Sequence, residues 1–93
     1  MPDELVVGTI LRVDEHPGAR APSLLLTVDL GPHGVEEAVL PTGSYEPSEL
    51  QGSQIVCHRS AEGAVTVGAH SHGKGFVVLR PIEDVEPGTL VSW

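Results

Sequence analysis

Five cationic side chains are the residues of this sequence best suited to engage an anionic ligand. They are Arg12, Arg20, Arg59, Lys74 and Arg80. Nucleic-acid binding draws much of its affinity from such cations, because they displace counterions from phosphates. Thirteen Asp and Glu residues nevertheless give the chain a net charge of −8. Any basic patch is therefore sparse, and we predict that any affinity for nucleic acid is weak and sensitive to salt.

The segment His70-Ser71-His72 carries two imidazoles at a spacing that could hold a metal ion. Residues two apart on a strand share a face, so both rings could bind one metal, with Cys57 or His58 as a conceivable third ligand. The flanking glycines, Gly68, Gly73 and Gly75, instead favour an exposed hairpin tip. We predict the tip and no cofactor, and keep a metal-binding protein or enzyme that uses His70 and His72 as an alternative.

Two other pairs of reactive residues have the wrong geometry for catalysis. Cys57 and His58 are neighbours, and so are Glu36 and Glu37. Neighbours on a strand point to opposite faces, which separates thiol from imidazole and one carboxylate from the other. A lone cysteine is more often a small buried hydrophobe. We predict no catalytic residue and no enzymatic activity.

The elements that must position these residues are short strands. Eleven glycines and eight prolines divide the 93 residues into short pieces, as is typical of a small β-barrel or sandwich. Pro47, with acidic neighbours, suits the first turn of one short helix within residues 45–50. The apolar pattern predicts strands at the following ranges: 5–13, 23–30, 35–40, 54–58, 65–67 and 76–79. We expect one domain, residues 1–93.

These segments resemble the CsaA-type branch of the tRNA-binding-domain family, with matching order and spacing from residue 7 to about residue 56. The opening strand with its glycine, the Pro-flanked arginine loop, the Tyr-to-Val stretch and two closing Pro-containing elements all have counterparts in that family. In this chain they are residues 7–10, 16–22, 45–56, 77–81 and 85–89.

The resemblance implies an all-β, five-stranded Greek-key OB-fold barrel with one short helix. It also implies a homodimer that binds either tRNA or, in a chaperone-like manner, extended polypeptide. Two places depart from the family pattern. Glu36 and Glu37 stand where a Ser-Ala-Gln segment is expected, and residues 58–67 form a shortened segment with Arg59 as its only cation. The leading hypothesis is a tRNA-binding module of low affinity, and the alternative is a binder of unfolded polypeptide or of a protein partner.

Composition supports two further expectations. Only one Trp, one Tyr and one Phe are present, so the core is thin and aliphatic, and association into a dimer would bury more apolar area. A single cysteine, an acidic start without an apolar run and no stretch of membrane-spanning length predict a cytoplasmic protein that does not bind a membrane.

Overall fold

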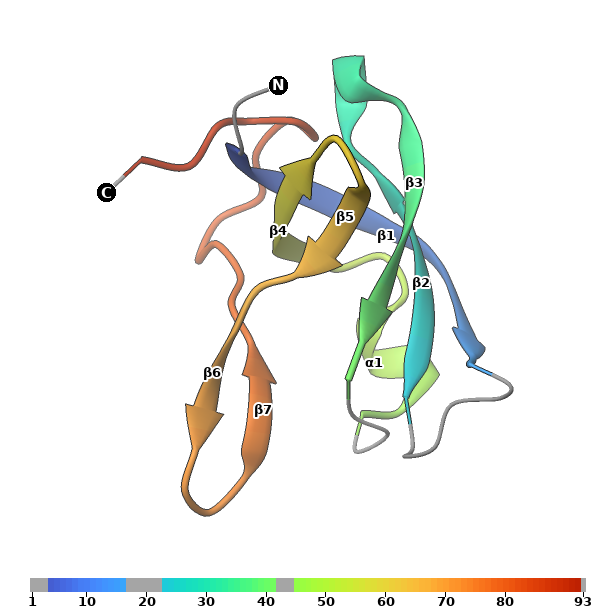
Figure 1. Ribbon diagram of the computed structural model, residues 1–93, viewed down its shortest axis with the longest axis vertical. Coiled ribbons are helices and arrows are strands. Elements are labelled where there is room, and N and C mark those ends of the chain that lie inside the picture. The colour runs from blue at the N-terminus through green and yellow to red at the C-terminus, as the bar shows by residue number, and fades with distance from the viewer. Residues whose placement is uncertain (1–3, 17–22, 42–44, 93) are drawn as a thin grey trace.

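The computed structural model describes residues 4–16, 23–41 and 45–92. Its described residues form strands and two short helical turns (Figure 1). In chain order the elements are β1 (Glu4–Glu15), β2 (Leu24–Asp29), the 3-10 turn η1 (Gly31–His33), β3 (Val35–Leu40), α1 (Pro47–Leu50), β4 (Gln54–Ser60), β5 (Gly63–Thr66), β6 (Gly68–Ser71) and β7 (Gly75–Val78).

Five of the strands close into a barrel in the order β1-β2-β3-β5-β4. The long strand β1 closes it, since its first half pairs with β4 and its second half with β2, both antiparallel. β3 and β5 form the parallel pair. The predicted all-β fold, an OB-type barrel with one short helix, is confirmed.

A bulge in β1 changes which side chains face the core. Regular alternation would place Leu11 and Val13 on the same face, but the register shifts between Ile10 and Arg12. Ile10 is fully buried, Leu11 is 46% exposed, and Val13 packs against the core. The side chains after the bulge therefore face the opposite way from regular alternation, because one extra residue reverses the facing of all that follow.

Aliphatic side chains fill the barrel, as the composition predicted. The largest fully buried ones are Ile10, Leu26, Leu30, Leu40 and Ile55. Gly8 lies among them because no larger residue fits: a Cβ there would stand 2.3 Å from Val28 Cγ1. A glycine inside a strand often marks such a close approach.

α1 is a single turn, as expected from its sequence. Its entry is fixed by a hydrogen bond from the Glu46 backbone N–H to the Glu49 carboxylate, 2.9 Å long, which satisfies one of the free donors of a helix start. Leu50 is the buried residue of the turn. α1 therefore holds the segment that begins at Tyr45 against the barrel.

Strands β6 and β7 form a separate antiparallel hairpin that extends away from the barrel (Figure 1). Sequence reasoning predicted a hairpin tip here but no pair of strands of its own. Phe76 and Val78 pack against the core cluster, and a Cβ on Gly68 would stand 2.5 Å from Phe76 Cζ. The base of the hairpin is thus fastened to the barrel.

The chain after β7 runs back along β1. Gly88 N–H donates to Val7 O (2.7 Å), Val7 N–H to Thr89 O (2.9 Å) and Val91 N–H to Leu5 O (2.8 Å). The side-chain amide of Gln54 binds the same segment, donating to Val85 O (2.6 Å) and accepting from Val85 N–H (2.9 Å).

No helix among the described residues is long and apolar enough to cross a membrane.

Candidate ligand-binding site

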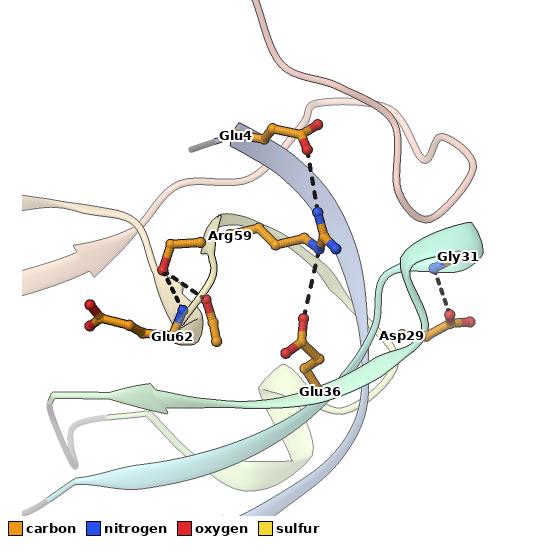
Figure 2. A network of polar contacts seen from close by, with 8 residues as sticks. Glu4, Asp29, Gly31, Glu36, Arg59 and Glu62 are labelled. Carbon is orange, nitrogen blue, oxygen red and sulfur yellow. Dashed lines mark hydrogen bonds and ion pairs between the residues drawn. The ribbon is translucent and has the colours of Figure 1, made fainter. Parts of the chain in front are cut away.

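Three charged side chains occupy one end of the barrel. Glu4, Glu36 and Arg59 continue the inward-facing rows that contain Val6, Ala38 and Cys57 two residues away. Glu4 and Arg59 stand opposite each other in the β1–β4 ladder. Arg59 Nη1 lies 3.3 Å from Glu4 Oε1, and Arg59 Nε lies 3.8 Å from Glu36 Oε2, so one guanidinium bridges two carboxylates (Figure 2).

This bridge determines what Arg59 can do. Its side chain is 18% exposed, and its charge faces two carboxylates. A phosphate would have to displace them, and leaving these half-buried acids unpaired is costly. The two departures from the family pattern therefore meet in space, where Glu36 is the partner of Arg59. We interpret Arg59 as a structural residue of the barrel end.

Cys57 is the next inward residue on β4 and is fully buried. Burial, with a smaller contribution from the Glu36 carboxylate, raises the pKa of its thiol from 9.0 to about 11. The thiol is therefore protonated at neutral pH and is a poor nucleophile or metal ligand. The expectation of a buried, inert cysteine agrees with this position.

The remaining candidate cations lie in different parts of the molecule. Arg12 Nε pairs with Asp14 Oδ2 at 2.9 Å on the outside of β1, with its side chain 73% exposed. Arg20 lies outside the described residues. Lys74 lies in the β6–β7 turn and Arg80 follows β7, and neither forms an ion pair within the described part of the chain. The structure thus brings Lys74 and Arg80 to the two ends of one strand, away from Arg59.

The two histidines singled out for a metal do not share a strand face. His70 lies on β6, where its ring meets Phe76 edge-on with centroids 5.5 Å apart and planes at 74°. β6 ends at Ser71, so His72 belongs to the turn. Cys57, a conceivable third ligand, is in the barrel core. The described residues contain no group of three His, Cys, Asp or Glu side chains that could hold a metal.

A groove runs along β7 between the hairpin and α1. It consists of three adjoining hollows of about 420, 260 and 470 Å³, with Tyr45 and Val77 shared by the first two and Arg80 and Ser53 by the last two. We call this the β7 groove. The residues lining it are Tyr45, Glu49, Leu50, Ser53, Gln54, Ile55, Lys74, Phe76, Val77, Val78, Arg80, Pro81, Ile82 and Asp84.

Tyr45 organises the middle of the β7 groove. Its hydroxyl accepts a hydrogen bond from the Val78 backbone N–H, 3.1 Å long, and its ring packs against the core. The sequence showed only that Tyr45 is the single tyrosine of the chain. Its partner is 33 residues away, so no local pattern could have revealed the contact.

Comparison with known proteins places this architecture in a class. The crystal structure of a chaperone CsaA from Bacillus anthracis str. Ames matches with a TM-score of 0.85 and 26% identity over 97% of this chain and 91% of that one. A CsaA chaperone protein from Picrophilus torridus matches with a TM-score of 0.87 and 23% identity, covering 97% and 92%. A MetRS-related protein from Pyrococcus horikoshii matches with a TM-score of 0.75 and 16% identity, covering 97% and 90%.

The chain is therefore similar in fold to the CsaA chaperone proteins and to the MetRS-related protein, and that fold is an OB-type barrel. Within that class its likeness is to the CsaA type, so the resemblance predicted from the sequence motifs is confirmed. Sequence comparison finds no match to a protein-family model or to a curated protein. The similarity to these proteins is therefore detected in the three-dimensional structure.

Proposed function

We propose that this protein binds extended, unfolded polypeptide in the manner of a chaperone, with the β7 groove as the binding site. The observation that carries the proposal is the make-up of that groove. Its walls include Leu50, Phe76 and Val77, with Lys74 at one end and Arg80 at the other. Apolar walls with a few placed charges suit an unfolded chain better than a run of phosphates. Two of the similar structures are described as chaperones.

Suppression of client aggregation tests this proposal. A chemically unfolded, reduced model client is diluted into buffer with and without the protein, at low and at high salt, and light scattering is followed. We expect scattering to fall with increasing protein at both salt concentrations, because apolar contacts are not screened. Unchanged scattering at a several-fold molar excess would contradict the proposal.

Weak tRNA binding is the second candidate. The OB-type barrel and the likeness to a MetRS-related protein favour it, and Lys74 and Arg80 are the described cations without an acidic partner. A site with only a few phosphate contacts has a low affinity for tRNA, and that affinity falls as the salt concentration rises. A gel-shift titration with tRNA at low salt tests it: a complex that dissolves as salt is added supports this candidate, and no complex removes it.

We also propose a homodimer. Val39 and Val65 are partners in the β3–β5 pair, and their side chains point outward. They are 37% and 51% exposed and make a small apolar patch suited to burial against a second copy, while Val35, 57% exposed, lies on the same face of β3 beyond Glu37. Light scattering coupled to size exclusion should give twice the chain mass, and Val65→Lys should give the monomer.

The protein acts by binding, without catalysis or a cofactor, because its buried thiol and its separated histidines offer no reactive set. It acts in the cytoplasm, where a free buried thiol such as Cys57 stays reduced. Fractionation of cells with detection of the protein tests the location.

A further inference from the structure

The outer edge of β7 carries backbone groups that β6 does not use. Leu79 N–H donates to Val67 O at 3.1 Å, so residue 79 directs its N–H toward the β6 side as in a hydrogen-bonded pair, although the return bond is replaced by Val67 N–H to Val56 O (3.0 Å) and Val56 N–H to Leu79 O (2.9 Å). Such pairs alternate along an antiparallel ladder, so residues 76 and 78 direct their N–H and C=O groups away from β6. The bond from Val78 N–H to Tyr45 Oη confirms that this outer edge faces the β7 groove.

These outward groups form the beginning of a strand-pairing edge. The N–H and C=O of Phe76 and the C=O of Val78 point toward the groove, and the Tyr45 hydroxyl takes the place that a partner strand would occupy at Val78 N–H. Unpaired strand edges recruit extended chains, because each backbone bond satisfies groups on both partners.

We propose that the β7 groove binds an extended apolar polypeptide segment by adding it as a further strand to the outer edge of β7, with a carboxylate of that segment held by Lys74. This inference rests on the proposed function and specifies its mode and its preferred client. Backbone pairing supplies binding that tolerates many sequences, while the groove walls select apolar side chains on one face of the segment.

Charge sets the position of the carboxylate. The hollow at the hairpin tip contains Lys74 and no acidic residue among its described lining. At the opposite end Arg80 is accompanied by Glu49 and Asp84. The charges of these three side chains sum to −1, so an anionic group is favoured at the Lys74 end and disfavoured at the Arg80 end. Residues 74 to 80 span about 20 Å when extended, which accommodates about six residues of a bound segment.

Backbone methylation of a synthetic peptide tests the strand addition. The probe is a fluorescently labelled eight-residue peptide of alternating Val and Thr with a Glu at one end. Only alternate residues of an added strand direct their N–H toward β7. We expect N-methylation of one alternate set to weaken binding at least tenfold, while methylation of the other set changes it less than about twofold. Equal effects of both sets would overturn the proposal.

Charge variants test the placement of the carboxylate. Lys74→Gln is compared with Ala61→Glu, which lowers the net charge by the same one unit in the exposed β4–β5 turn. We expect Lys74→Gln to weaken the Glu-ended peptide several-fold and leave a Gln-ended peptide unchanged, whereas Ala61→Glu affects the two peptides alike. Equal behaviour of the two variants would overturn the role of Lys74.

The outcomes separate this inference from the proposed function. If the protein suppresses client aggregation but both methylated sets bind equally, the polypeptide-binding function stands and strand addition is wrong. If neither the client nor the peptide binds, both fail. A second copy of this chain could also occupy this edge, and hydrogen exchange of the Phe76 amide tests that. If the amide is protected in the peptide-free homodimer and loses its protection on dilution, a second copy occupies the edge and the proposal is overturned.

Discussion

The barrel end and the β7 groove use the same kind of charged side chain in opposite ways. At the barrel end, Arg59 lies in an inward row between Glu4 and Glu36, and its ion pairs connect strands β1, β3 and β4. In the groove, Lys74 and Arg80 lie at the ends of a hairpin strand outside the barrel, without an ion-pair partner among the described residues. Position in the sheet, more than residue type, decides which cation is available to a ligand.

The difference also separates stability from recognition. Backbone groups of the barrel strands are paired around a closed ring, so that region has little left to offer a partner chain. The hairpin is a two-stranded sheet with an open edge beside an apolar hollow. We therefore expect substitutions at the barrel end to alter stability, and substitutions in the groove to alter binding.

Gln54→Ala should have the largest effect on stability. The Gln54 amide is buried and makes three hydrogen bonds, two to the Val85 backbone and one to Thr9 Oγ1. Its loss leaves buried backbone groups unpaired and frees the segment that carries Arg80, at a cost of about 3 kcal/mol. Urea unfolding measures this, with Gln51→Ala, an exposed amide of the same type, as a control that changes stability by less than about 0.5 kcal/mol.

Arg59→Met should lower the free energy of unfolding by about 2 kcal/mol, because two half-buried carboxylates are left facing each other. Replacing Glu4 and Glu36 by Gln in the same protein should restore most of the loss. Arg12→Met, which removes an exposed pair, should cost less than about 0.5 kcal/mol. Equal losses from the two arginine substitutions would show that the barrel end is no more than a surface ion pair.

The Cys57 thiol should make the barrel sensitive to alkali. Its pKa is 9.0 in the reference state and about 11 in the fold, so the folded state keeps a proton that the unfolded state has lost. Stability is then fully present below pH 9 and falls as the pH rises toward 11. Between pH 8 and 10 the reduced protein should lose about 1.3 kcal/mol more than Cys57→Ala. Parallel stability curves for the two proteins would contradict this.

Lys74→Gln should have the smallest effect on stability, less than about 0.5 kcal/mol, because Lys74 is an exposed turn residue without an acidic partner. The unfolding midpoint measures it. A loss as large as that of Arg59→Met would mean that the hairpin cation is structural and would remove the contrast between the two regions.

Much of the barrel could be predicted from the sequence, because its signals are local. Alternation of Leu24, Leu26 and Val28 identified a half-buried strand, and Pro47 with its acidic neighbours identified the helical turn; both are observed. The bulge at Leu11 was not predicted. An inserted residue leaves the composition of the strand unchanged and shows only in the pairing with β2.

The site was less predictable, because it depends on contacts between distant segments. The sequence identified five cations but not that Arg59 would meet Glu4, 55 residues away, or that Tyr45 would meet Val78. The free edge of β7 is a property of the backbone and of the ladder register, which residue types do not encode. Resemblance to a family supplied the fold, and the groove emerged only from the arrangement in space.

Mapping a bound client by NMR tests the central claim most directly. Backbone amide shifts of the protein are followed as an unfolded, reduced polypeptide is added at physiological salt. We predict that the shifts concentrate at residues 45–50 and 74–80, with the Phe76 amide among the largest, while the barrel-end residues Glu4, Glu36 and Arg59 stay unchanged. Shifts centred on the barrel end, with an unperturbed β7, would contradict the assignment of ligand binding to the β7 groove.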